Sequence, residues 1–432
     1  DENRSQIKEI AAAPDPSWHS VVVPMEQMEH RLGRVWAPVG HLNAVMNSPG
    51  LREAYNDCLP KLSDYATTVG QNEDLFNAYR RVAETESSLD AAQQKVVENA
   101  VRDFRLAGVA LPAVDKARFK EIMQELSTLQ ARFEETLLDA TNAWSRHITD
   151  ETTLAGLPES VLDRARESAR EKDLSGYLFR LDFPTYHAIQ THADNRALRR
   201  EFYEAWVTRA SDIGPHAGRW DNTSLMASIL CLRNEAASLL GFSCYAEYSL
   251  ATKMAGTVDE VRDFLAKLAE RSRPVAQREL AEIESHAGEP LEAWDIAYHS
   301  EKLREERFAI SDEELRPYFP VQLVIQGLFE MTSRLFGIRI DEASPPDCWH
   351  PDVVYYEVSD DDGLLGGFYV DLYARGKKRG GAWMDECVGR ARTEHGVDRP
   401  VAFLVCNFMP ASGNRPPLLS HDEVVTLFHE FG

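Results

Sequence analysis

The chain has 432 residues, of which 44% are hydrophobic and 27% are charged, and its formal net charge is −23. This length and composition indicate a globular protein of two or three domains, because a single hydrophobic core stops growing at about 250–300 residues. The acidic balance argues against a nucleic-acid partner, since phosphate binding needs a basic patch, and no run approaches the roughly 18 apolar residues of a membrane span.

Residues 1–150 show helical periodicity almost throughout, and we expect an N-terminal helical region over this range. The clearest case is 117–144, where apolar residues recur at steps of one, three and four and therefore share one stripe of a helix. The members of that stripe are Phe119, Ile122, Met123, Leu126, Leu129, Phe133 and Leu137. Packing against a core is sufficient to explain such a stripe.

Residues 151–345 are expected to form a second, mainly helical region. The periodicity breaks over 152–186, where short apolar runs bounded by Gly or Pro indicate strands or loops. Helical periodicity resumes after that segment and continues over 187–337. Two histidines in this region, His187 and His192, are five residues apart, which is the wrong spacing for a shared metal on one helix face.

Two helices of the second region have recognisable ends or interruptions. The segment 220–242 predicts a helix with Gly241 as its C-terminal cap, because glycine readily adopts the left-handed conformation that ends helices. The segment 257–288 predicts one or two helices, interrupted near Pro274, since proline removes a hydrogen-bond donor from a helix interior.

Residues 346–432 have a different texture and are expected to form a third region. The segment 353–373 holds two β-rich runs around an Asp-Gly turn, which predicts a hairpin, and 401–408 predicts a third strand. A small β-sheet therefore precedes the final helix. The basic run ARGKKRGG at 374–381 is interpreted as a solvated loop.

Six cysteines are scattered along the chain without CxxC or metal-ligand spacing. They are Cys58, Cys231, Cys244, Cys348, Cys387 and Cys406. Most have apolar neighbours, and we interpret them as reduced core residues of a cytoplasmic protein. No nucleotide-binding glycine pattern and no GxSxG nucleophile motif is present in the sequence.

The last twelve residues, HDEVVTLFHEFG, predict an amphipathic helix that begins after Ser420. Glu423 follows Ser420 by three residues, which is a capping-box pattern. At 100° per residue the apolar side chains share one stripe, whose members are Val424, Leu427, Phe428 and Phe431. His429 then lies on the opposite side of the helix, and Glu430 flanks the same surface.

Two interpretations of His429 and Glu430 remain open on these residues alone. A zinc-peptidase helix carries two histidines at i and i+4 on one face, with a glutamate after the first that acts on the zinc-activated water. A histidine four residues after His429 would lie beyond Gly432. Alternatively, a His-Glu pair on the polar face of an amphipathic helix is ordinary solvated surface.

The resemblance to a known family extends beyond this helix. The final segment is similar to the active-site segment of the thimet oligopeptidase family, and further stretches resemble its bacterial oligopeptidase A branch, in the family's order and at similar spacing. These stretches are LDFPTYHAIQTHADNRALRREFYEAWVTRAS (181–211), DNTSLMASILCLRNEAASLLGF (221–242), KMAGT (253–257), WDIAYHSEKL (294–303), ISDEELRPYFP (310–320), WHPDV (349–353) and GGFYVDLYARGKKRGGAWMD (366–385).

The resemblance implies a mostly α, zincin-like fold in which two helical lobes flank a deep channel, with a small β-sheet next to the active-site helix, so that residues 346–432 would begin the catalytic region. It implies a metallopeptidase with one zinc per active site that cleaves short unstructured peptides. His429 matches the family's first zinc ligand, and Glu430 matches its general base. The sheet is implied to pair with the substrate backbone, and the hairpin at 353–373 and the strand at 401–408 are the candidate strands.

The family's second His ligand, its Glu ligand and other catalytic residues correspond to positions beyond Gly432. We therefore expect these 432 residues to be one piece of a longer protein, inactive without the remaining C-terminal part, and to have lost a short N-terminal stretch. Two alternatives have no catalysis: a peptide-binding protein of the same fold with an incomplete metal site, and a helical scaffold.

Overall fold

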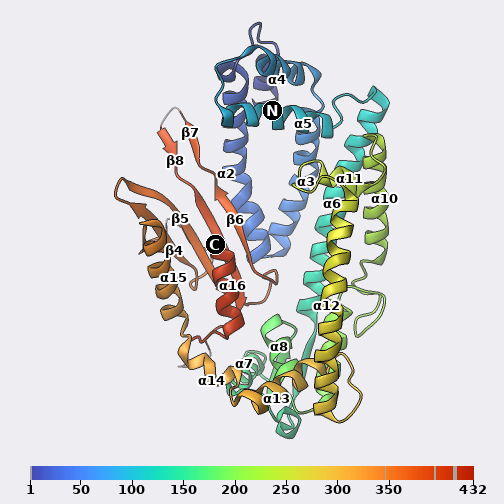
Figure 1. Cartoon of the computed structure of the whole chain (residues 1–432), viewed down its shortest axis with the longest axis vertical. Helices are drawn as coiled ribbons and strands as arrows, with labels where there is room; N and C mark the ends of the chain where they lie inside the picture. Colours follow the sequence, from blue (N-terminus) through green and yellow to red (C-terminus); the bar gives the residue numbers. More distant parts are fainter. Residues whose placement is uncertain (1, 346, 394–395, 412–415) are drawn as a thin grey trace.

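The computed structural model describes residues 2–345, 347–393, 396–411 and 416–432. Most of the described chain is helical, and a small sheet lies beside the last helix, so the predicted fold class is confirmed (Figure 1). The sheet with its flanking helices stands on one side of the molecule, and the long helices α6, α10 and α12 stand on the other. The division into regions 1–150, 151–345 and 346–432 stays a prediction.

The first part of the chain is a helical array with its own apolar core. Its elements are α1 (Glu2–Ala11), the π-helical η1 (Trp18–Val22), α2 (Val23–Val45), α3 (Pro49–Gly70), α4 (Glu73–Thr85), α5 (Ala91–Leu106) and α6 (Ala113–Ala143). On α4, Leu75, Tyr79 and Val82 recur at helical spacing and are buried. The helix begins at Asn72, whose side chain accepts a hydrogen bond from Leu75 N at 2.9 Å.

The helix predicted over 117–144 is confirmed as α6. Four members of its stripe are buried: Phe119, Ile122, Leu126 and Leu129. They pack against apolar residues of α10 (Thr223–Leu239), and α10 is the helix predicted within 220–242. Gly241 follows its end with φ +83°, a conformation that glycine adopts without strain.

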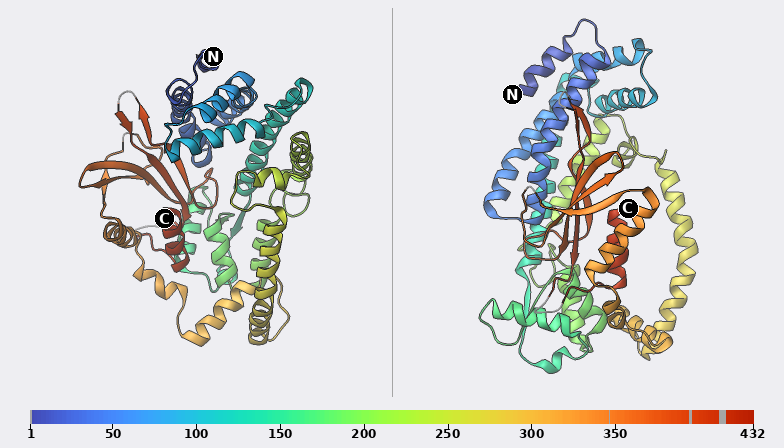
Figure 2. Two further views of the ribbon diagram at one scale, coloured as in Figure 1. Left: turned by 45° about the horizontal axis from the view of Figure 1, so that its top comes forward. Right: turned by 90° about the vertical axis from the view of Figure 1, so that its left-hand side faces the viewer.

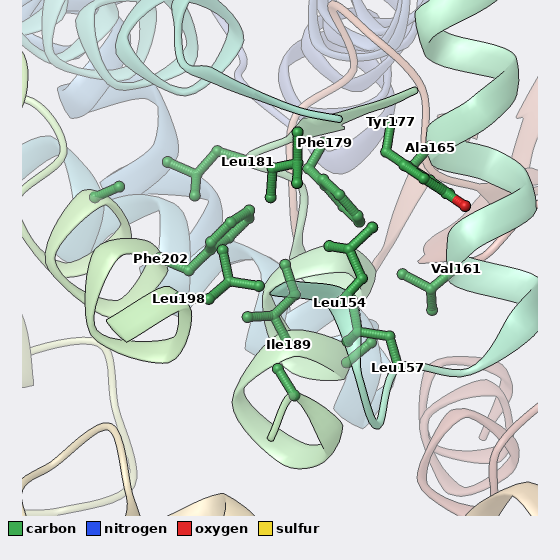
Figure 3. Packing of buried hydrophobic residues seen from close by; sticks show 14 of the residues in the cluster. Leu154, Leu157, Val161, Ala165, Tyr177, Phe179, Leu181, Ile189, Leu198 and Phe202 are labelled. Carbon is green, nitrogen blue, oxygen red and sulfur yellow. The ribbon is translucent and has the colours of Figure 1, made fainter. Parts of the chain in front are cut away.

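A second core lies at one end of the molecule, and Figure 3 shows its packing. It is built by β1 (Ser145–Ile148), η2 (Glu151–Leu154), α7 (Glu159–Arg170), β2 (Tyr177–Arg180), α8 (Phe183–His192) and α9 (Arg196–Val207). The prediction of strands or loops over 152–186 holds for β2 but missed α7. That helix buries Val161, Ala165 and Ala169, and two alanines give a weak hydrophobic periodicity in a highly charged segment.

Further helices connect this core to the sheet. They are α11 (Tyr245–Leu250), α12 (Val258–Ala287), α13 (Ile296–Phe308), α14 (Asp312–Leu315), the 3₁₀ helix η3 (Arg316–Tyr318) and α15 (Val321–Phe336). The predicted interruption near Pro274 is wrong, because α12 is one continuous helix. None of its residues is buried, so water can solvate the carbonyl that proline leaves without a donor.

The main sheet has five strands in the order β3-β4-β5-β9-β6. They are β3 (Arg339–Ala343), β4 (Val354–Asp360), β5 (Gly363–Tyr373), β9 (Val401–Phe408) and β6 (Trp383–Val388), and a separate pair is formed by β7 (Ala391–Thr393) and β8 (Gly396–Asp398). The predicted hairpin is confirmed as β4 and β5, and the predicted strand as β9. Strands β5 and β9 run parallel, and the other neighbours are antiparallel.

The sheet lies between α2 on one face and α15 with α16 (His421–Phe431) on the other (Figure 2). Alternation along β9 explains this layering: Phe403 and Val405 pack with Val45 of α2, while Leu404 and Cys406 face the core shared with α15 and α16. Across the described residues, no helix combines the length and apolarity needed to cross a bilayer.

Two expectations about polar and sulfur-containing residues need correction. The run 374–381 is a loop and mostly exposed, as expected, but it is not solvated throughout, because the Lys378 side chain is 0% exposed and pairs with buried Asp371. Six free cysteines are present, but Cys406 is the buried one among them, Cys231 is exposed, and the rest are half-buried. Apolar sequence neighbours therefore predicted a core position correctly at Cys406 and not at Cys231.

Candidate active site

Helix α16 begins where the sequence predicts, and its first turn is closed by a capping box. Ser420 Oγ accepts a hydrogen bond from Glu423 N at 3.2 Å, and Ser420 N donates to Glu423 Oε2 at 2.8 Å. These bonds satisfy donors that a helix start would otherwise leave unpaired. The capping fixes the helix nine residues before His429, so the register of the polar face is set from this end.

The apolar stripe of α16 docks on the sheet and on α15, as predicted. Leu427 is 2% exposed, and Val424, Phe428 and Phe431 are partly buried against the same core. The Phe431 ring lies 5.7 Å from the Phe368 ring of β5, centroid to centroid. Burial of this stripe leaves the opposite side of the helix facing away from the sheet.

A short segment before α15 fastens the start of α16. Arg316 Nη1 donates to Leu418 O at 3.2 Å, and Arg316 lies 3.5 Å from the Glu423 carboxylate. Backbone bonds join the same two segments, from Val321 N to Pro417 O and from Leu419 N to Phe319 O. Helix α16 is therefore held by its capping box, its apolar stripe and this clamp.

His429 and Glu430 lie on the part of α16 that the stripe leaves uncovered. The His429 side chain is exposed and Glu430 is half-buried. Neither side chain has a hydrogen-bond or ion-pair partner among the described residues. Within the same residues, no group of three or more His, Cys, Asp or Glu side chains is arranged to hold a metal ion. The described residues thus bring together one imidazole and one carboxylate.

Glu430 also lies close enough to the sheet to influence Cys406 on β9. Burial raises the pKa of the Cys406 thiol to about 12, and the negative charge of Glu430 contributes to the increase while Lys378 opposes it. Cys406 is therefore a neutral thiol packed under α16, not a nucleophile.

Pairing of the sheet with a peptide backbone needs a strand with an unpaired side. The hairpin at 353–373 and the strand at 401–408 belong to the sheet, as expected, but β4, β5 and β9 each have neighbours on both sides. The edge strands of the described sheet are β3 and β6. Of these, β6 contacts α16, and its Met384, Asp385 and Glu386 are exposed.

The sequence interpretation also missed a buried ionic cluster around Asp371. A signal was present: Asp371 interrupts the apolar run of GGFYVDLY, and a charge at an inward strand position needs a nearby counter-charge. Arg375 and Lys378 follow within seven residues and supply that charge.

A small sheet under a helix with an adjacent His and Glu, within a mostly helical chain, is the arrangement expected of a helical metallopeptidase. Comparison with known proteins agrees: the chain belongs to Peptidase family M3, whose model matches residues 189–432. The model for the N-terminal domain of neurolysin and thimet oligopeptidase matches residues 1–116.

Curated relatives and solved structures extend this result. The chain is 48% identical to oligopeptidase A of Escherichia coli, over 99% of this chain and 65% of the relative. It is 31% identical to dipeptidyl carboxypeptidase of the same organism, over 100% of this chain and 64% of the relative. The chain thus spans just under two thirds of the length of these relatives.

Among solved structures, a putative oligoendopeptidase F from Bacillus anthracis matches with a TM-score of 0.54 at 12% identity, over 99% of this chain and 63% of that one. A structure titled PZ peptidase A with inhibitor 2 matches with a TM-score of 0.52 at 14% identity, over 99% of this chain and 60% of that one. At such identities the likeness concerns the fold.

Proposed function

We propose that this protein is a zinc-dependent metalloendopeptidase that hydrolyses short unstructured peptides in the cytoplasm, with one zinc per active site. The observation that carries the proposal is the pair of exposed His429 and half-buried Glu430 on a firmly docked helix, where neither side chain has a partner among the described residues, in a chain of family M3. A His-Glu pair that is only solvated surface would not need a helix held in place by a capping box, an apolar stripe and the Arg316 clamp.

The donor chemistry of this pair fits zinc. A neutral imidazole is a common zinc ligand, and the exposed His429 side chain has no competing hydrogen bond in the described residues. Zinc, when bound, would supply the Lewis acidity that activates water and polarises a peptide carbonyl. Further ligands would have to come from other residues of the full-length protein, because the described ones offer no third group.

Glu430 would act as the general base and then as the general acid. Its carboxylate would accept the proton of the attacking water and pass it to the leaving amine nitrogen. Glu430 is half-buried and lies close enough to β9 to influence the Cys406 thiol. No described cation pairs with it, so the carboxylate is free to accept a proton.

The substrate would bind as an additional strand on the edge of β6. Edge-strand pairing uses main-chain hydrogen bonds and is therefore tolerant of the peptide's side chains. It also requires an extended peptide, which excludes folded proteins and selects short unstructured ones. The strand β6 fits this role because its outer side has no strand partner in the described sheet and because it contacts α16.

The second candidate is a peptide-binding protein of the same fold that does not cleave. It would apply if the metal site of the whole protein were incomplete, and the described residues supply one imidazole and one carboxylate to that site. Both candidates predict peptide binding, and they differ in zinc content and turnover.

The test uses the full-length protein with an internally quenched peptide and a measurement of zinc per chain. Glu430→Gln should keep zinc and the fold but lower the turnover by a factor of about 100 to 10,000, the range of a lost general base. His429→Ala should lose zinc. The matched controls on the same helix are Asp422→Asn and His421→Ala, whose side chains are 93% and 62% exposed, and both should retain zinc and turnover.

An intact mass measured with the zinc content shows which polypeptide carries the activity. Hydrolysis that survives Glu430→Gln at the wild-type rate would refute the proposed base. Peptide binding without zinc or turnover in the wild type would establish the second candidate.

A further inference from the structure

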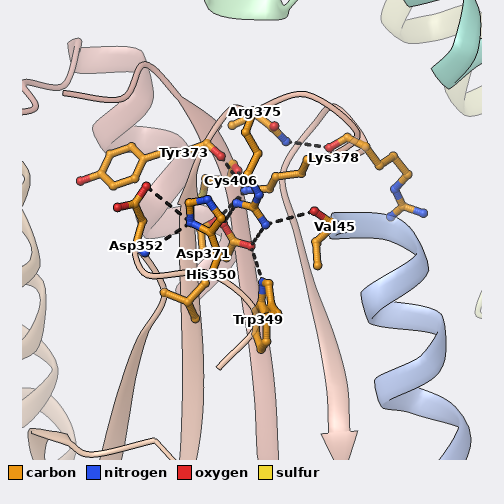
Figure 4. A network of polar contacts seen from close by, with 12 residues as sticks. Val45, Trp349, His350, Asp352, Asp371, Tyr373, Arg375, Lys378 and Cys406 are labelled. Carbon is orange, nitrogen blue, oxygen red and sulfur yellow. Dashed lines mark hydrogen bonds and ion pairs between the residues drawn. The ribbon is translucent and has the colours of Figure 1, made fainter. Parts of the chain in front are cut away.

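Lys378 is a fully buried cation at the centre of the loop that joins β5 to β6. Its Nζ donates to Asp371 Oδ1 at 2.7 Å, to Asp371 O at 3.0 Å, to Tyr373 O at 2.9 Å and to Cys406 O at 2.7 Å (Figure 4). The acceptors come from the end of β5 and from β9. One ammonium group therefore joins these two parallel strands to the loop that follows β5.

Asp371 provides the anion for this cluster. Its carboxylate accepts two bonds from Arg375, at 2.6 and 2.7 Å, and one from Trp349 Nε1 at 2.9 Å. Burial alone would raise its pKa, but hydrogen bonds and charge from Arg375 and Lys378 outweigh burial and lower the pKa of Asp371 to about 2. Burial lowers the pKa of neighbouring His41 to about 4, so His41 adds no charge near neutral pH.

The rest of the loop is fastened on both sides by hydrogen bonds to backbone carbonyls. Towards α2, Arg375 Nη2 donates to Val45 O at 3.1 Å and Arg379 N donates to Ala44 O at 2.8 Å. Towards β9, Asn407 Nδ2 donates to Arg379 O at 2.9 Å and to Gly381 O at 2.6 Å. The loop therefore leads into β6 from a fixed position.

Strand β6 begins directly after this loop, and its first residue, Trp383, pairs with Val405 of β9. We propose that Lys378 is a positioning residue that holds edge strand β6 in register on β9 and so fixes the site where a peptide backbone binds. This inference rests on the proposed peptidase function and deepens it, because it assigns a determinant of substrate binding outside α16.

Lysine is suited to this position for a geometric reason. An ammonium group is compact and directs its donors toward carbonyls from different strands, whereas a planar guanidinium is longer and has a fixed fork. Replacing Lys378 by methionine keeps the length of the side chain but leaves the carbonyls of Tyr373 and Cys406 without their donor. Asp371 and Arg375 then remain as a neutral pair, so the variant is expected to fold.

The first experiment measures the position of β6 without reference to activity. Hydrogen exchange followed by mass spectrometry should show exchange at least about tenfold faster over 383–388 in Lys378→Met, because local opening of that strand is less costly. Exchange over β3 and β4 should not change. The matched control is Lys377→Met, since Lys377 is the exposed neighbour on the same loop and its side chain makes no hydrogen bond among the described residues.

The second experiment measures kinetics in the zinc-loaded full-length protein. Lys378→Met should raise KM for an extended peptide about tenfold, the equivalent of one or two lost hydrogen bonds, and leave kcat within about twofold. A peptide whose backbone amides are N-methylated cannot pair with an edge strand, so its KM should be nearly the same in both proteins. Asn407→Ala, which loosens the loop without touching the buried charges, should raise KM in the same direction by a smaller factor.

The outcomes separate the two proposals. The peptidase proposal stands if wild-type turnover depends on Glu430. The positioning role is overturned if exchange over 383–388 is unchanged in Lys378→Met and KM is unchanged in both Lys378→Met and Asn407→Ala. If the wild type has no peptidase activity, the peptidase proposal is refuted, and the role of Lys378 in substrate binding with it, even where exchange over 383–388 is faster in Lys378→Met than in the wild type. An equal rise in KM for the N-methylated peptide would also overturn the role, since the effect would not act through β6.

Discussion

Two polar clusters of this chain lie on either side of β9 and differ in how their charges are partnered. Asp371 and Lys378 are buried and Arg375 is half-buried, and most donors and acceptors among them are used within the protein, with Arg375 Nε as an exception. His429 and Glu430 on α16 have no partner among the described residues. A saturated cluster can position neighbouring elements, whereas an open pair is available to a ligand. The number of hydrogen-bond and ion-pair partners therefore distinguishes a positioning cluster from a ligand-binding pair more clearly than the residue types do.

The largest expected effect comes from opening the saturated cluster. Asp371→Asn removes the anion and leaves buried Lys378 and half-buried Arg375 without their counter-charge, so we expect the free energy of unfolding to fall by about 3–5 kcal/mol. Urea unfolding at neutral pH measures it. The control is Asp361→Asn in the β4–β5 turn, whose side chain is 100% exposed and whose removal should leave the midpoint unchanged. Equal midpoints for both variants would mean that the buried cluster is not saturated in solution.

A second variant tests whether the open pair, His429 and Glu430, depends on the packing of the apolar stripe of α16. Leu427 of α16 is 2% exposed, and Leu427→Ala should lower the free energy of unfolding by about 2–4 kcal/mol through the cavity that it leaves. Val425 on the same helix is 54% exposed, so Val425→Ala is the matched control and should change stability little. In the zinc-loaded protein, Leu427→Ala should also release zinc more readily to a chelator. A chelation rate equal to that of the control would show that the metal site does not need this docking.

Acid should destabilise the wild type more than Asp371→Asn, because protonation of Asp371 removes the anion of the buried cluster. The folded-state pKa of Asp371 is about 2, below the value of about 3.9 for an unfolded chain. Its stabilising contribution, on the order of 3 kcal/mol for this difference, is therefore complete above about pH 5 and is lost as the pH falls towards 2. The stability gap between the wild type and Asp371→Asn should narrow by about 1 kcal/mol between pH 7 and pH 3. A constant gap would contradict the depressed pKa, because other carboxyls affect both proteins alike.

The same contrast explains what could be predicted from the sequence. The capping pair Ser420 and Glu423 and the stripe around Leu427 are local patterns, so the start and buried face of α16 followed from residue spacing alone. The β4–β5 hairpin followed from alternating apolar residues around an Asp-Gly turn. Each feature depends on residues that are close together in the sequence, which is where periodicity and capping rules apply.

What could not be predicted depends on contacts between distant segments. Lys378 looks like one of several cations in a basic loop, and its burial follows from contacts with Asp371 of β5 and Cys406 of β9. The edge position of β6 follows from the strand order of the whole sheet, which no local pattern encodes. Pro274 was misjudged because an exposed helix tolerates a missing hydrogen bond that a buried one would not.

The smallest effect concerns the start of the helix that carries the open pair. Ser420→Ala removes the oxygen that accepts from Glu423 N, and we expect a loss of about 1 kcal/mol in the free energy of unfolding. Arg316 and the apolar stripe still hold α16, so turnover of the zinc-loaded protein at 25 °C should change less than twofold, and the loss should show in the urea midpoint. Ser420→Asp preserves an acceptor at the cap and should restore most of the stability. If turnover instead fell in proportion to cap strength across Ser420→Asp and Ser420→Ala, fraying of the first turn would reach His429, and the cap would belong to the site as much as the docking of Leu427 does.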